Sequence, residues 1–207
     1  MTGEWMTFIV GIDPGSRKTG YGIIKQEKAK VIFVDAGVIY TKVADMPGRI
    51  ACIFKKLSEI LSQHELNENN AKAAIEQVFV AKNPDSALKL GQARGAAIAA
   101  LTMNNLNVCE YSARQIKQAV SGYGAADKEQ VSKMVQLLLK LDFVPQEDAA
   151  DALACAICHA YADAQNQAVL LGGTAVLSSG QPKPSKKTKG RLRLSEDQLL
   201  QILTKRS

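Results

Sequence analysis

The amino-acid sequence predicts an α/β fold: a five-stranded mixed sheet, with its first three strands antiparallel, flanked by helices. Three observations support this prediction. The chain opens with three strand-like apolar segments joined by short polar connections, continues with a strand–helix–strand pattern, and then shows helical periodicity. Strands followed by helices give a sheet with helices packed on it, because each apolar face must be buried against another element.

The first three predicted strands lie between residues 8 and 40. Residues 8–12 (FIVGI) form an unbroken apolar run that stops at the turn sequence Asp-Pro-Gly-Ser, residues 13–16. Residues 20–24 and 31–40 have the composition of two further strands, and their polar connections are short enough for hairpins. Hairpin connections predict antiparallel pairing.

Helical and strand-like segments alternate after residue 46. Apolar side chains recur at helical spacing over residues 47–64, which predicts an amphipathic helix. Residues 71–79 predict a fourth strand that carries Glu76 at or near its end, the Ala- and Leu-rich segment 86–104 predicts a helix, and residues 107–111 predict a fifth strand. Three more helical patterns follow, at residues 112–120, 127–140 and 146–166.

Composition excludes several classes of protein. The chain has 207 residues, 46% of them hydrophobic and 22% charged, which is typical of a soluble globular protein and not of collagen or a disordered chain. No apolar run approaches the ~18 residues of a membrane span, and residues 1–7 lack the basic start of a signal peptide. We therefore expect a cytoplasmic protein whose four cysteines are free thiols.

The positive charge is concentrated at the C-terminus. Residues 181–207 hold eight basic and two acidic side chains, a net charge of +6, so the remaining chain carries 18 of each sign out of totals of 26 and 20. Residues 172–190 are rich in Gly, Ser, Pro and Lys, and Ser195-Glu-Asp-Gln has the form of a capping box before a short apolar helix. We predict a folded domain over 1–171 and a basic tail over 172–207, which can attract phosphate.

Four acidic residues are the candidate chemical site. Asp13 and Glu76 end apolar strands, whereas Asp148 and Asp151 lie three apart on one face of the last predicted helix. Converging carboxylates repel one another, so such a cluster is best explained by hard divalent cations such as Mg²⁺ or Mn²⁺. Two ions can then promote a phosphoryl displacement. The alternatives are a turn cap at Asp13, an exposed strand end at Glu76, and a first-turn acid at Asp148.

Four motifs in the same order closely resemble those of the RuvC family of Holliday junction resolvases, which belongs to the ribonuclease H-like superfamily. The resemblance covers roughly residues 7–166. The motifs are GIDPGS with TGYG at residues 11–22, IEQVF at 75–79, SALKLGQARG at 86–95 and DAADALA at 148–154.

The resemblance implies a homodimer that binds four-way DNA junctions and nicks two strands of like polarity at symmetric positions, leaving 5′-phosphate and 3′-hydroxyl ends. It also implies the RuvA and RuvB branch-migration proteins as partners, and two Mg²⁺ ions per subunit with Mn²⁺ able to substitute. The four acids Asp13, Glu76, Asp148 and Asp151 match the family's metal-binding catalytic residues; some relatives have His in place of Asp148. Residues matching the family's DNA contacts are Phe79, Lys82, Lys117 and Lys128.

Other interpretations of these residues remain. Phe79 could be a core residue at a strand end, and either Lys117 or Lys128 taken alone is typical of a solvated helix residue. A non-catalytic junction-binding module of the same fold is the principal alternative function, and an actin-like ATPase that uses residues 13–15 for phosphate would need a longer, duplicated chain. The C-x-x-C-H sequence at 155–159 resembles a haem attachment site, but it lies within an Ala-rich helix and no haem is expected.

Overall fold

The computed structural model describes residues 6–27, 30–77 and 83–170, and the side chains of this part as far as residue 166. The strands are β1 (Met6–Asp13), β2 (Lys18–Glu27), β3 (Lys30–Tyr40), β4 (Ala71–Glu76) and β5 (Val108–Tyr111). The helices are α1 (Met46–Gln63), α2 (Pro84–Met103), α3 (Ala113–Ser121), α4 (Lys128–Leu139) and α5 (Glu147–Leu170). The elements predicted for residues 8–166 are all present, with small shifts at their ends, whereas the predicted tail over 172–207, with its short helix, lies outside the described residues.

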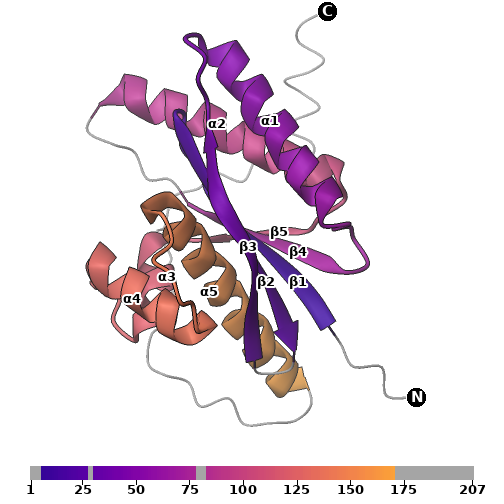
Figure 1. The fold of residues 1–207 in the computed structure, drawn as a ribbon, viewed down its shortest axis with the longest axis vertical. Helices are drawn as coiled ribbons and strands as arrows, with labels where there is room; N and C mark the ends of the chain where they lie inside the picture. Colours follow the sequence, from indigo (N-terminus) through magenta and orange to yellow (C-terminus); the bar gives the residue numbers. More distant parts are fainter. Residues whose placement is uncertain (1–5, 28–29, 78–82, 171–207) are drawn as a thin grey trace, which may run out of the picture. The chain divides into compact units, whose positions relative to one another are not determined.

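The strands form one five-stranded sheet in the order β3-β2-β1-β4-β5. β1 pairs with β2, and β2 with β3, in antiparallel fashion, whereas β4 runs parallel to both β1 and β5. The predicted fold class, a mixed sheet with its first three strands antiparallel, is therefore confirmed. Figure 1 shows α1 and α2 on one face of the sheet and α3, α4 and α5 on the other.

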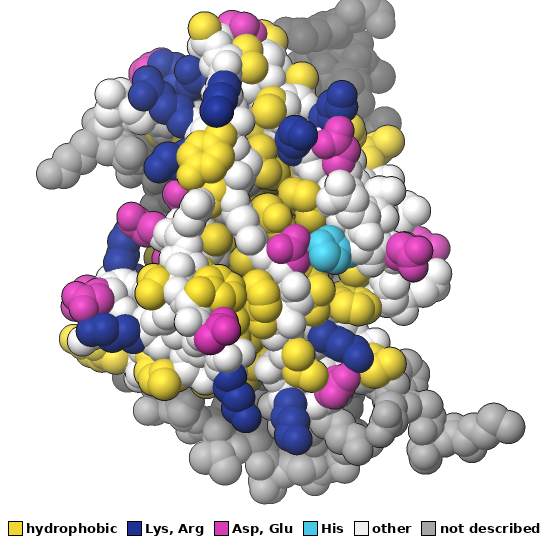
Figure 2. Space-filling view, in the orientation of Figure 1, with side chains coloured by type: hydrophobic (Ala, Val, Ile, Leu, Met, Phe, Trp, Pro, Cys, Tyr) yellow, Lys and Arg dark blue, Asp and Glu magenta, His cyan; other side chains and the backbone are white. Residues whose placement is uncertain are grey.

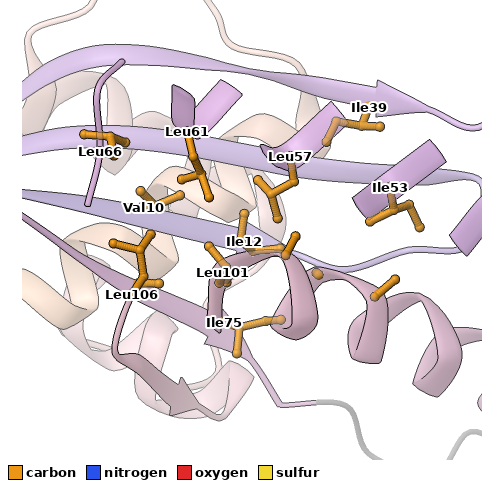
Figure 3. Close-up of a cluster of buried hydrophobic side chains, with 14 of the residues drawn as sticks. Val10, Ile12, Ile39, Ile53, Leu57, Leu61, Leu66, Ile75, Leu101 and Leu106 are labelled. Carbon is orange, nitrogen blue, oxygen red and sulfur yellow. The ribbon is translucent and has the colours of Figure 1, made fainter. Parts of the chain in front are cut away.

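Each face of the sheet has its own apolar core. On the face covered by α1 and α2, aliphatic side chains from the sheet and from both helices are fully or almost fully buried (Figure 3), among them Val10, Ile12, Ile53, Leu57 and Leu101. On the other face, Ile9 and Ile24 of the sheet pack against the Ala-rich surface of α5. Successive residues of a strand point to opposite faces, so Val10 and Ile12 face α1 and α2, while Gly11 and Asp13 face α5.

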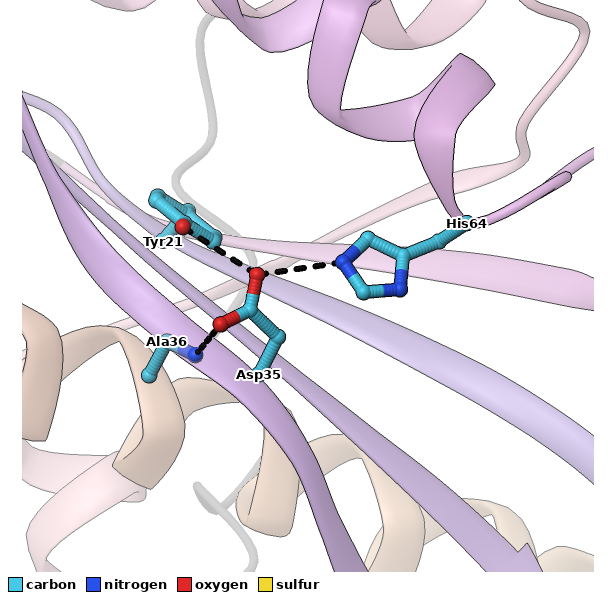
Figure 4. A network of polar contacts seen from close by, with 4 residues as sticks. All are labelled: Tyr21, Asp35, Ala36 and His64. Carbon is cyan, nitrogen blue, oxygen red and sulfur yellow. Dashed lines mark hydrogen bonds and ion pairs between the residues drawn. The ribbon is translucent and has the colours of Figure 1, made fainter.

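A polar network fixes the end of α1 to the sheet on the face away from Asp13. The Tyr21 hydroxyl donates to the Asp35 carboxylate at 3.2 Å, and Nε2 of His64, the C-terminal cap of α1, lies 3.0 Å from the same oxygen (Figure 4). The main-chain N–H of Ala36 donates to the second carboxylate oxygen at 2.9 Å. Burial and the Asp35 charge raise the pKa of Tyr21 to about 12. These contacts tie β2, β3 and α1 together.

The described surface mixes both signs of charge. In the orientation of Figure 1, lysine and arginine side chains surround a central band of exposed hydrophobic side chains, with acidic side chains between them (Figure 2). All four cysteines are free, and Cys155 and Cys158 are buried in α5, as expected for packing residues. No helix in the described part of the chain is long and apolar enough to cross a membrane.

Candidate active site

The parallel pairing of β1 and β4 places two of the four acids side by side. The register of this pair ends at Ile12 opposite Ile75. One residue further along each strand lie Asp13 and Glu76, the last residues of β1 and β4. Two parallel strands end at the same edge of a sheet, so this pairing alone brings both carboxylates to one edge.

Glycines in β1 and β2 bring the other two acids to this edge. A Cβ atom on Gly11 would lie 2.0 Å from the carbonyl oxygen of Ala152, and one on Gly20 would lie 1.9 Å from that of Asp148. Neither position can carry a side chain without displacing α5, so the backbone of the helix rests directly on the two strands. This close approach carries Asp148 and Asp151, in the first two turns of α5, to the end of β1.

The charges at this edge are strongly coupled. Burial raises the pKa of Asp13 most, the carboxylates of Asp151, Glu76 and Asp148 raise it further, and nearby Lys128 lowers it, so that its pKa is about 7. An aspartate in water has a pKa near 3.8. Asp13 is therefore a buried acid with three carboxylates near it, an arrangement that is typical of functional sites.

The pKa values of Glu76 and Asp151 are also raised, again mainly by burial. Burial raises the pKa of Glu76, with a further contribution from Asp151, while Lys128 and Lys117 lower it. Burial also raises the pKa of Asp151, against the influence of Lys128. The two lysines therefore belong electrostatically to the acidic site.

Helix α4 presents Lys128 to the acids. Asp127 caps α4 in a reciprocal capping box with Gln130, which fixes the position of its first residue, Lys128. The Lys128 ammonium group forms an ion pair with Glu147 and lies 3.6 Å from Asp151 Oδ2. Lys128 is well exposed, with 67% of its side chain accessible, so it can also reach a phosphate.

The donor set fits a hard divalent cation. All four acids offer carboxylate oxygens, the ligands that Mg²⁺ and Mn²⁺ prefer. Burial first, and neighbouring carboxylates second, raise the pKa values of Asp13, Glu76 and Asp151, and a cation at this edge would favour their ionised forms. Within the described residues, however, no three His, Cys, Asp or Glu side chains are arranged closely enough to hold a metal ion. The four acids thus lie at one edge of the sheet, but no three of them are close enough together to hold one ion.

The segment with two of the predicted DNA contacts is not described. Phe79 and Lys82 lie in residues 78–82, outside the described part of the chain. The flanking residues are well anchored: the main-chain N–H of Gln77 donates to the Tyr111 carbonyl at 2.8 Å, and Asn83 caps α2 by accepting from the N–H of Asp85.

The sequence analysis gave no role to two pairs of residues that hold the Glu76 end of the sheet. Arg94 of α2 donates through Nε to the main-chain oxygen of Glu76 at 3.3 Å, and its Nη2 lies 2.7 Å from the Glu110 carboxylate. On the opposite face, the Tyr111 hydroxyl lies 2.8 Å from Nδ1 of His159 in α5.

These two pairs hold the Glu76 end of the sheet, one pair on each face. Glu110 and Tyr111 are successive residues of β5, next to β4, so their side chains point to opposite faces of the sheet. His159 is 95% buried, 5% being exposed, and its Nε2 has no hydrogen-bond partner among the described residues. The only signal in the sequence was the presence of polar residues in otherwise apolar segments.

The comparisons with known proteins agree with the resemblance found in the motifs. The family model described as crossover junction endodeoxyribonuclease RuvC matches residues 9–159. A protein of that name from Psychrobacter sp. is 53% identical over 198 residues, which span 95% of this chain and 100% of that protein. Another from Acinetobacter baumannii is 56% identical over 181 residues, 87% of this chain and 98% of that one.

Solved structures give the same result. T. thermophilus RuvC in complex with a Holliday junction substrate matches with a TM-score of 0.70 and 30% identity, over 77% of this chain and 96% of that one. The yeast mitochondrial Holliday junction resolvase matches with a TM-score of 0.55 over 79% of this chain and 82% of that one. At 17% identity, the yeast protein supports the fold alone.

Proposed function

Because the chain belongs to the RuvC family of crossover junction endodeoxyribonucleases, we propose that it resolves Holliday junctions by a two-metal-ion hydrolysis at Asp13, Glu76, Asp148 and Asp151. The observation that carries the proposal is geometric: Asp13 and Glu76 end adjacent parallel strands, and the first turns of α5, with Asp148 and Asp151, pack directly on β1 and β2. The nicks fall at symmetric positions in two strands of like polarity, and the products carry 5′-phosphate and 3′-hydroxyl ends. The enzyme acts in the cytoplasm together with the RuvA and RuvB branch-migration proteins.

The four carboxylates would hold two Mg²⁺ ions per subunit, with Mn²⁺ able to substitute. When bound, the ions supply an activated water and stabilise the oxygen that leaves phosphorus. Asp13 and Glu76 are fixed by the rigid ends of paired strands, and Asp148 and Asp151 by a helix packed without intervening side chains. Lys117 and Lys128 bind phosphates of the cleaved strand, adding positive charge beside the acids.

We propose that the active form is a homodimer. Two sites related by a two-fold axis match the symmetry of a four-way junction, which pairs the two nicks. The outer surface of α2 is the candidate dimer surface, because Leu88 is 64% exposed and a Cβ on Gly91 or Gly95 would meet nothing within 4 Å. Glycine inside a helix costs about 0.5–1 kcal/mol relative to alanine, and close packing of a second copy would offset that cost.

For residues 172–207, we propose nonspecific DNA affinity that weakens with salt, or docking on RuvA and RuvB.

Cleavage of a synthetic four-way junction tests the proposed function. The wild type should nick the junction symmetrically with Mg²⁺ and not with EDTA, and leave linear duplex intact. Asp13→Asn and Asp151→Asn should each lower the cleavage rate by at least about a hundredfold while junction binding persists. Asp142→Asn, a change at an exposed position, serves as the control.

Two results would contradict the proposal. Junction binding without cleavage by the wild type under any divalent ion would leave a non-catalytic binding module. Full activity of both Asp13→Asn and Asp151→Asn would show that these acids are not catalytic. The mass of the protein in solution, measured by sedimentation, tests the dimer separately.

A further inference from the structure

Tyr123 is an exposed aromatic residue that lies in the chain between Lys117 and Lys128. It lies between α3 and α4, and 63% of its surface is accessible. Its neighbours along the chain are Gly122 and Gly124, so no adjacent side chain covers the ring. Within the described residues, its hydroxyl group has no hydrogen-bond partner.

The loop that carries Tyr123 is held in one conformation. The Gln118 side-chain amide donates to the Gly122 carbonyl at 2.6 Å and accepts from the Gly124 N–H at 3.1 Å, closing the loop on itself. The Ser121 hydroxyl accepts from the Tyr123 N–H at 3.3 Å. Gly122, with φ of +75°, ends α3 in the left-handed conformation that favours glycine. The ring is therefore presented from a fixed backbone, which lowers the entropy lost on binding.

The loop joins the two lysines that act on the catalytic acids. The Ser121 hydroxyl lies 2.7 Å from the carbonyl oxygen of Lys117, one turn earlier in α3. On the other side, the Tyr123 carbonyl accepts from the Ala126 N–H at 3.1 Å, two residues before Lys128. Lys117 lowers the pKa of Glu76, and Lys128 lies 3.6 Å from Asp151. Tyr123 thus lies in the loop that connects two helices, each of which carries a lysine that acts on the acidic site.

We infer that Tyr123 is a DNA-contact residue whose ring packs face-on against one nucleotide of the strand that Lys117 and Lys128 hold. The inference rests on the proposed function, since it needs a DNA strand at the acidic site. Cationic side chains with an aromatic ring between them are suited to single nucleotides, because the lysines bind phosphate while the ring contacts the base or sugar. The contact adds affinity without adding charge.

The dependence of binding on salt separates this contact from an electrostatic one. Binding of the full chain to a fluorescent four-way junction is measured in EDTA, from about 50 to about 200 mM salt. Tyr123→Ala should weaken binding about 5- to 150-fold at every salt concentration, with an unchanged slope of log affinity against log salt. Tyr123→Phe, which keeps the ring, should restore the affinity. Lys117→Ala should instead reduce the slope by about 1.

Leu137→Ala is the matched control, because Leu137 is 70% exposed on α4 and should not affect binding. Circular dichroism verifies that each variant is folded. Wild-type affinity in Tyr123→Ala would overturn the inference, as would a reduced salt slope equal to that of Lys117→Ala. A wild-type protein that does not bind the junction would instead overturn the proposed function, so the two failures are distinguishable.

Discussion

Asp13→Asn is expected to stabilise the metal-free protein at neutral and alkaline pH. Burial and three neighbouring carboxylates raise the pKa of Asp13 from 3.8 to about 7. Between these values the folded state retains a proton that the unfolded state has released, so stability falls as the pH rises through this window and is level above it. At 1.36 kcal/mol per pKa unit, the raised pKa of Asp13 costs the folded state about 4 kcal/mol at pH ~8 and about 1.6 kcal/mol at pH ~5.

Asparagine keeps the shape of aspartate and removes its charge. Its half-buried amide retains a desolvation cost of about 1–3 kcal/mol, so the expected net gain at pH ~8 is about 1–3 kcal/mol. For a domain of this size, that gain corresponds to a rise in Tm of roughly 2–12 °C. At pH ~5 the gain should be close to zero, because folded Asp13 is then largely protonated.

Urea unfolding in EDTA at the two pH values, monitored by circular dichroism, measures the difference directly. Asp142→Asn, at an exposed position, is the control and should change stability by less than about 0.5 kcal/mol at both pH values. Added Mg²⁺ should stabilise the wild type more than Asp13→Asn. An equal stability difference at both pH values, or a loss of stability in Asp13→Asn at pH ~8, would refute the electrostatic reasoning.

Two further predictions concern how the acids are held. Gly20→Ala would place a Cβ 1.9 Å from the carbonyl oxygen of Asp148, so α5 must shift, and junction cleavage should fall by at least about tenfold while junction binding in EDTA is retained. Arg94→Gln breaks the contacts with Glu110 and with the main chain of Glu76; it should raise the Mg²⁺ concentration needed for half-maximal cleavage, and Glu110→Gln should do so less, because the Arg94 bond to Glu76 remains. An unchanged Mg²⁺ requirement in Arg94→Gln would show that this contact has no influence on Glu76.

The fold was predictable because its elements carry strong local signals. The apolar runs of β1 and β2, the turn at residues 13–16 and the helical periodicity of α1 each specify an element without reference to the rest of the chain. The ribonuclease H-like fold implied by the motifs is confirmed by the solved RuvC structure. Tertiary contacts have no such local signal. The Arg94–Glu110 and Tyr111–His159 pairs join segments that only the folded chain brings together.

The prediction that four acids would meet depended on an assumption that only the structure explains. The three-residue spacing predicted that Asp148 and Asp151 share one helix face, but it could not predict how far they lie from Asp13. That distance is set by Gly11, Gly20 and the small residues of α5, which let the helix backbone contact the strands. Burial of apolar surface along this contact therefore stabilises an arrangement that carboxylate repulsion opposes. Gly11 and Gly20 belong to the same motif as Asp13, at residues 11–22, so the sequence that positions the first acid also determines how closely the helix can bring the others.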